Sequence, residues 1–364
     1  MRFSLRYNNP PSILLSSKML HMKFLWIAMF SIAVFVATSC NHPNEAVQKN
    51  NMDSLVGKDS TDPQINALSE KIKSTPKNPE LYFLRSNIFL QHGNIPASFS
   101  DMSDAIALDS TNIKYYFAIA DIYLKGGSAD GAIDAFNHII RTDPENTEAL
   151  IKLSKVYFYQ KDYKNSMQQL ARVQELDKDN FETWFIRGLN FKETGDTSRA
   201  ITSFQKSVQI KPDFYDGYMQ LGLITGHKKN SPAAQYFDNA IRIDSTTAEA
   251  YYAKAMYYQE HGENEKAKST YEALITVNPQ FESSYFNLGY IYIKQDSIDK
   301  AYRMFDFAIK VKPAYAEAYY YRGLCAEEKG NKEQAISDFR QALTLKPGYE
   351  LAQKELNTLT QSSK

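Results

Sequence analysis

Apolar residues between positions 79 and 349 recur three and four residues apart, in segments that short polar stretches interrupt. This spacing places the apolar side chains on one face of an α-helix. The pattern therefore predicts consecutive amphipathic helices throughout this part of the chain. Two such helices form a unit whose landmarks recur every 34 residues, with one deletion in the fifth unit. The predicted units span residues 79–112, 113–146, 147–180, 181–214, 215–247, 248–281, 282–315 and 316–349.

Four positions in each unit carry a residue of constant type. The fourth and twenty-fourth residues are aromatic or large and apolar, and the eighth and twentieth are small. The eighth positions hold Ser86, Ala120, Ser154, Gly188, Gly222, Ala255, Gly289 and Gly323. Small side chains at these positions let two antiparallel helices approach closely. Because one helical hairpin cannot bury its own apolar face, we expect the hairpins to stack on each other.

This pattern resembles the tetratricopeptide repeat (TPR), whose landmarks include a Leu-Gly pair and a proline after the second helix. The pair occurs as Leu221-Gly222 and as Leu288-Gly289. The closing proline occurs as Pro144, Pro212, Pro279, Pro313 and Pro347. The resemblance covers residues 79–349. It implies an all-α fold, a right-handed α-solenoid of about eight helix-turn-helix units.

Both ends of a solenoid need a helix that shields the open apolar face. Upstream of the first unit, Ile65, Leu68 and Ile72 form one apolar stripe. The stripe predicts a half-repeat capping helix at residues 63–78. A second amphipathic segment predicts a C-terminal capping helix and tail at residues 350–364.

The N-terminal region has the pattern of an export signal. Lys23 precedes an apolar run at residues 24–36, which is shorter than the about 20 residues that a membrane-spanning helix needs. The run ends in Ala37-Thr38-Ser39-Cys40, which resembles the lipobox of bacterial lipoproteins. The resemblance implies cleavage before Cys40 and lipidation of its thiol. Ordinary signal cleavage, which would leave a free thiol, is the alternative.

Residues 1–39 are therefore interpreted as a signal peptide with a spurious N-terminal extension, explained by a start codon at Met19 or Met22 instead of Met1. Residues 40–62 are polar and predict a flexible tether. The chain as a whole thus resembles a TPR lipoprotein of the Bacteroidetes type. The expected location is the bacterial cell envelope, with the lipid anchor in the outer membrane and the protein facing the periplasm.

Composition and motifs argue against several classes of function. Lys and Arg number 42 and so do Asp and Glu, so the chain has no basic surplus for nucleic acid. Two cysteines, Cys40 and Cys325, cannot form a disulfide framework or a cysteine zinc cluster. The sequence contains no metalloprotease, phosphate-loop or serine-nucleophile motif. We therefore expect no enzymatic activity, no metal or cofactor, and no small-molecule substrate.

In TPR proteins the first helix of each unit lines a concave groove. Carried onto this sequence, the fifth positions form an apolar row of Phe83, Phe117, Ile151, Phe185, Met219, Tyr252, Phe286 and Tyr320. The ninth positions continue it with Leu189, Leu223, Met256, Tyr290 and Leu324, and the twelfth with Leu90, Leu124, Phe158 and Ile293. If exposed, this row predicts a surface for a partner peptide or helix. The alternative is that the fifth residue packs against a neighbouring helix.

The expected function is a non-enzymatic scaffold or adaptor, anchored by lipid in the cell envelope, that binds a protein partner in the groove. The alternative is a glycan-binding outer-membrane lipoprotein of the nutrient-capture type. Such proteins build their sugar site from long irregular insertions. Seven of the eight units here keep their length, which favours the adaptor.

Overall fold

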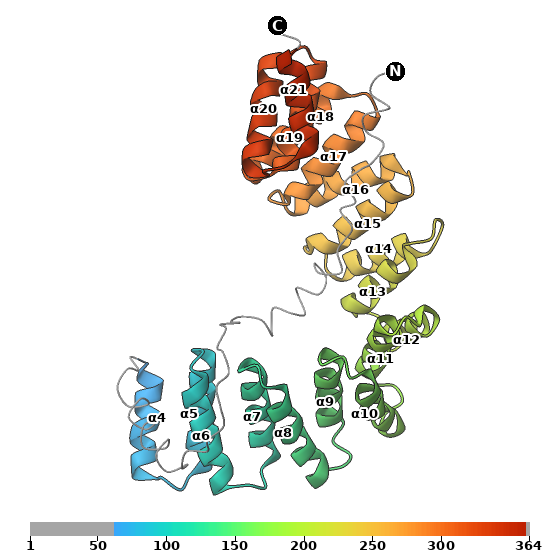
Figure 1. Cartoon of the computed structure of the whole chain (residues 1–364). Coiled ribbons are helices and arrows are strands. Elements are labelled where there is room, and N and C mark those ends of the chain that lie inside the picture. The colour runs from blue at the N-terminus through green and yellow to red at the C-terminus, as the bar shows by residue number, and fades with distance from the viewer. Residues whose placement is uncertain (1–61, 362–364) are drawn as a thin grey trace. The chain divides into compact units, whose positions relative to one another are not determined.

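The computed structural model describes residues 62–361, which form eighteen α-helices and no strands (Figure 1). The predicted all-helical solenoid class is confirmed. The predicted signal peptide (1–39), the lipidation site Cys40 and residues 40–61 of the predicted tether lie outside the described residues, as do residues 362–364.

The described residues fall into two compact bodies, one ending at Thr194 and the other beginning at Gly195. The N-terminal body contains α4 (Pro63–Ser74), α5 (Pro79–Gln91), α6 (Ile95–Leu108), α7 (Ile113–Lys125), α8 (Ala129–Thr142), α9 (Thr147–Tyr159), α10 (Tyr163–Leu176) and α11 (Phe181–Glu193). The C-terminal body contains α12 (Thr197–Ile210), α13 (Tyr215–Thr225), α14 (Ala233–Ile243), α15 (Ala248–Glu260), α16 (Asn264–Val277), α17 (Glu282–Lys294), α18 (Ile298–Val311), α19 (Ala316–Glu328), α20 (Lys332–Leu345) and α21 (Glu350–Gln361).

Each predicted unit holds two of these helices, which we call its A helix and its B helix. The A helices are α5, α7, α9, α11, α13, α15, α17 and α19, and each is followed by its B helix. The boundary between the two bodies falls inside the predicted unit 181–214, because α11 ends the first body and α12 begins the second.

The small residue at the eighth position allows the A and B helices to touch. A Cβ atom on Gly222 would lie 2.4 Å from the ring of Phe237, the large residue on the facing helix α14. A Cβ atom on Gly289 would lie 2.8 Å from the ring of Phe305. In these two units the eighth position is therefore small because the aromatic ring of the B helix fills the space beside it.

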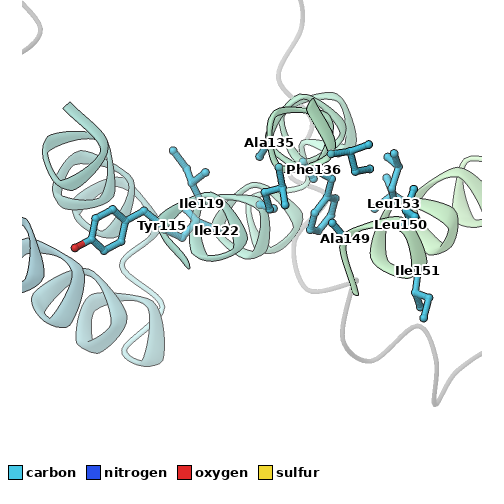
Figure 2. Close-up of a cluster of buried hydrophobic side chains, with 14 of the residues drawn as sticks. Tyr115, Ile119, Ile122, Ala135, Phe136, Ala149, Leu150, Ile151 and Leu153 are labelled. Atoms are coloured by element: carbon cyan, nitrogen blue, oxygen red, sulfur yellow. The ribbon is translucent and has the colours of Figure 1, made fainter. Parts of the chain in front are cut away.

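The core of the N-terminal body continues from one unit to the next. Figure 2 shows one cluster that joins side chains of α7, α8 and α9, including Tyr115, Phe136 and Leu150. Phe136 and Leu150 are fully buried. Apolar contact between successive units thus supplies the burial that a single hairpin lacks.

Single helices stand at both ends of the array. On α4, Ile65 and Ile72 are buried, and Ile65 belongs to an apolar cluster with Phe89 of α5. At the other end α21 begins at Glu350, where a ninth unit would begin, and buries Ala352. A cleft of about 480 Å³ beside α21 is lined by several polar residues, including the amides Gln353, Asn357 and Gln361. These amides give α21 a hydrophilic face, as a capping helix requires.

Most turns between an A helix and its B helix contain a residue with positive φ. In the second unit this residue is Gly127, with φ 81°. Lys161 and Asp296, with φ 61° and 56°, adopt the same conformation in the third and seventh units. Side chains with a Cβ atom are strained there. Between residues 62 and 361 no helix has the length and apolar character needed to span a membrane.

Candidate protein-binding surface

Most of the predicted groove residues are buried. Ten of the seventeen are between 2% and 8% exposed, namely Ile151, Phe185, Met219, Tyr252, Phe286, Tyr320, Met256, Tyr290, Leu324 and Ile293. These residues therefore do not form an exposed row, and their burial agrees with the second of the two interpretations, in which they pack against a neighbouring helix. Of the other seven, Leu124 is exposed, and six are partly exposed, namely Phe83, Leu90, Phe117, Phe158, Leu189 and Leu223.

In three units of the C-terminal body, an aromatic residue at the last position of the unit covers the fifth residue. Phe281 lies 5.1 Å from Tyr252, and Tyr315 lies 5.1 Å from Phe286, measured between ring centroids. In the eighth unit the corresponding ring of Tyr349 lies 5.2 Å from Tyr320. In these three units the fifth residue is thus covered by the ring that ends its own unit.

The B helix closes the other side of the same residues. The ring of Phe286 lies 5.6 Å from Phe305 of α18, and the ring of Tyr320 lies 5.9 Å from Phe339 of α20. The fifth side chain is therefore enclosed between the B helix and the end of its unit. This geometry agrees with the alternative interpretation, in which the fifth residue stabilises the stack.

Polar groups in this covered layer hydrogen-bond to each other. The Tyr271 hydroxyl donates to Gln259 Oε1 at 2.9 Å, and Asn287 Nδ2 donates to the Tyr252 hydroxyl at 3.5 Å. Burial raises the pKa of both Tyr252 and Tyr271, so both hydroxyls stay neutral at physiological pH. The layer therefore has internal hydrogen bonds and carries no charge at these tyrosines.

The N-terminal body has asparagine at the position where the C-terminal body has these rings. The residues before its four A helices are Asn78, Asn112, Asn146 and Asn180, and each side chain accepts a hydrogen bond from a backbone N–H in the first helical turn. Phe214, Thr247, Phe281 and Tyr315 precede the A helices of the C-terminal body and make no such cap. A capping asparagine has no ring to cover the fifth residue.

Charged side chains connect the A helices of the N-terminal body. Lys114 Nζ of α7 lies 3.0 Å from Glu80 Oε1 of α5, and 4.0 Å from the ring centroid of Phe83. Lys152 Nζ of α9 lies 3.8 Å from Asp121 Oδ1 of α7. Ion pairs between successive A helices show that α5, α7 and α9 present one continuous face.

Three large apolar side chains are exposed on this face. Leu84 on α5 is 42% exposed, Leu124 on α7 is 37% exposed and Tyr159 on α9 is 56% exposed. We call the surface formed by Phe83, Leu84, Leu90, Phe117, Leu124, Phe158 and Tyr159 the N-terminal A-helix face. A group of exposed apolar residues on a folded protein commonly marks an interaction site.

Sequence reasoning found five of these seven residues and missed Leu84 and Tyr159. They stand at the sixth and thirteenth positions of their A helices. Residues seven apart lie on the same side of a helix. The helical period therefore places the sixth and thirteenth positions on the same side of the A helix.

Two buried ion pairs were also missed, and both join an A helix to its own B helix. Arg85 donates to both carboxylate oxygens of Asp101 at 2.7 Å, and Arg322 donates to those of Asp338 at 2.9 and 2.7 Å. Asp101 and Asp338 are almost completely buried. The signal was an arginine followed by an aspartate sixteen residues later in the first and last units.

Residues 62–361 contain one cysteine and no cluster of metal-ligating side chains. Among them, no group of three or more His, Cys, Asp or Glu side chains is arranged to hold a metal ion. Cys325 is buried, and burial raises the pKa of its thiol to about 12. The thiol is therefore protonated at physiological pH and is a poor nucleophile.

Comparisons with solved structures show similar folds. The C-terminal part of a TPR repeat-containing protein from Cytophaga hutchinsonii aligns over 67% of this chain and 99% of its own, with 20% identity and a TM-score of 0.58. A TPR protein from Parabacteroides merdae aligns over 68% and 98%, with 17% identity and a TM-score of 0.45. The MamA protein aligns over 46% and 92%, with 25% identity and a TM-score of 0.42. No curated protein matches the chain.

Matches to family models identify the family more directly than these structural similarities do. One model described as tetratricopeptide repeat matches residues 117–181 and 286–350. A second with the same description matches residues 181–214 and 248–281. Together they span more than half of the 364 residues. The chain therefore belongs to the tetratricopeptide repeat family.

Proposed function

We propose that this chain is a non-enzymatic adaptor that binds a protein partner through the N-terminal A-helix face. TPR proteins generally mediate protein–protein interactions, and solenoids offer extended surfaces for them. The observation that carries the proposal is the exposure of Leu84, Leu124 and Tyr159 on three successive A helices of one body.

The two bodies differ in what their A helices offer a partner. In the C-terminal body, the rings of Tyr252, Phe286 and Tyr320 are covered by residues of the same unit. In the N-terminal body, Phe83 and Phe117 remain partly exposed beside the three exposed side chains. This contrast favours the N-terminal body as the binding region.

Affinity capture from solubilised cell envelopes tests the proposal. The bait is the full chain, the test variant is Leu124→Glu with Tyr159→Glu, and the control is Leu176→Glu. Leu176 is a suitable control because it is 44% exposed in the same body but lies on the B helix α10. We expect the test variant to lose a partner that the wild type and the control retain. Equal recovery with all three baits, each folded by circular dichroism, would exclude the face.

We also propose that lipid on Cys40 anchors the adaptor in the bacterial cell envelope, in the outer membrane with the repeats facing the periplasm. The support is the sequence Ala37-Thr38-Ser39-Cys40 after an apolar run. Several acyl chains make membrane attachment stable, whereas one chain is marginal. Intact-mass measurement on detergent-extracted protein should show a lipidated N-terminal cysteine, and Cys40→Ala should release the protein from the membrane fraction. An unmodified thiol in membrane-extracted wild type would contradict the anchor.

A further inference from the structure

The charges on the N-terminal A-helix face are balanced within the chain. The three acidic residues of α5, α7 and α9 are Glu80, Asp121 and Glu148, and each lies within 4 Å of a lysine ammonium. Lys152 alone serves two of them, at 3.8 Å from Asp121 and 3.7 Å from Glu148.

Most of the basic residues of α5, α7 and α9 also form ion pairs. Arg85 pairs with Asp101 of α6, and Lys155 pairs with Glu182 of α11. Among the described residues, Lys125 at the end of α7 is the one basic residue of α5, α7 and α9 without an ion pair. The helices α5, α7 and α9 therefore carry few unpaired charges that could attract a charged partner.

The largest exposed side chains of these A helices are apolar. Leu84, Leu124 and Tyr159 expose large side chains, one on each successive A helix. Removing this apolar surface from water favours association. Aromatic or leucine side chains of a partner that pack against it would bury it.

From this charge balance we infer the chemistry of the partner, an inference that rests on the proposed function. We propose that the partner presents an uncharged segment with two or three large apolar side chains to the N-terminal A-helix face. The partner needs no acidic or basic residues beside this segment. The charged side chains of the face already form ion pairs within the chain before the partner binds. Binding is then driven by apolar burial and depends weakly on ionic strength.

Fluorescence polarisation with the full chain tests this inference. Three labelled synthetic peptides share the same Leu and Phe anchors and differ in their flanks, which are rich in Ser and Gln, in Lys, or in Glu. Binding is measured at about 50 mM and about 500 mM NaCl, because the higher concentration screens exposed charges. The double variant Leu124→Glu with Tyr159→Glu and the control Leu176→Glu are measured in parallel.

We expect the uncharged peptide to bind at least as tightly as the other two, with affinities that change by less than about threefold between the salt concentrations. The double variant should weaken binding by at least about tenfold, and the control should not. Binding of only the Lys-rich or only the Glu-rich peptide, lost at high salt, would overturn the inference and leave the proposed function standing. Failure of every peptide, together with capture that the double variant does not affect, would overturn both.

Discussion

The ring of Tyr315 stacks on the ring of Phe286, with centroids 5.1 Å apart and planes 28° from parallel. Tyr315 ends the seventh unit, and Phe286 is the fifth residue of that unit. The same two positions of the second unit hold Asn146 and Phe117, and there Asn146 accepts a hydrogen bond from the Ala149 N–H at 2.9 Å. In these two units the residue at the last position thus either covers the fifth side chain or caps the next helix.

Replacing Tyr315 with asparagine should destabilise the C-terminal body. The change removes an aromatic pair worth about 0.5–1.5 kcal/mol together with the apolar area that the ring buries. A helix cap worth about 1 kcal/mol offsets part of this loss. We expect a net decrease of about 1–2 kcal/mol in the free energy of unfolding, measured with urea. Tyr315→Phe keeps the ring and should lower the free energy of unfolding by less. Equal decreases in the two variants would contradict this role of the ring.

The reciprocal change, Asn146→Tyr, should cover Phe117 and weaken partner binding. Loss of the cap should lower the free energy of unfolding by about 1 kcal/mol, which leaves the body folded. Affinity for the uncharged peptide should fall by about tenfold, because the new ring occupies space beside Phe117. Asn146→Ala removes the cap without adding a ring and serves as the control. Equal affinities of the two variants would show that Phe117 takes no part in binding.

Glycine at position 161 should stabilise the N-terminal body. Lys161 has φ 61°, whereas Gly127 occupies the equivalent turn of the preceding unit with φ 81°. Relief of this strain should raise the free energy of unfolding by about 0.5–1 kcal/mol for Lys161→Gly. The opposite change, Gly127→Ala, should lower it by about 1 kcal/mol. Denaturant midpoints of the two variants should therefore move in opposite directions, and a shift in the same direction would rule out this explanation.

A large side chain at Gly222 should disrupt the packing of α13 on α14. Even a Cβ atom there would lie 2.4 Å from the Phe237 ring. We expect Gly222→Leu to lower the free energy of unfolding by about 3 kcal/mol, because the helices must separate. Lys228→Leu, in the exposed turn of the same unit, is the control and should change it by less than about 0.5 kcal/mol. A thermal melt of both variants measures the difference, and similar melting temperatures would be incompatible with close contact at Gly222.

The thiol of Cys325 should be unreactive while the protein is folded. Burial raises its pKa from the ordinary value of 9.0 to about 12, so almost no thiolate exists at pH 8. A thiol reagent should modify Cys325 after addition of denaturant and not before, which ultraviolet absorbance can follow in a Cys40→Ala background. The unfolded state loses the thiol proton at lower pH than the folded state. The contribution of this thiol to the free energy of unfolding is therefore fully present below pH 9 and decreases as the pH rises towards 12. Rapid modification in buffer alone would contradict the buried position.

The repeats could be predicted from the sequence because their determinants are local and periodic. Gly222 and Phe237 belong to columns of small and large residues that recur in every unit, and their contact follows from that register. The capping helices could be predicted for the same reason, since Ile65 and Ile72 form an apolar stripe of helical period.

The exposure of the groove could not be predicted from the fifth position alone. Tyr252 and Phe117 occupy the same place in the repeat, but Phe281 covers the first and Asn146 leaves the second partly exposed. For these two side chains, exposure depends on a residue that the period places at the far end of the unit. The bidentate pair of Arg85 and Asp101 was missed because it occurs in few of the units, so it forms no column.

The choice between asparagine and tyrosine before an A helix has a genetic consequence. The codons of these two amino acids differ only in their first base, so one point mutation would exchange a capping side chain for an aromatic ring. A lineage of such proteins could therefore lengthen, shorten or move its recognition surface unit by unit, while the helical framework underneath stays the same.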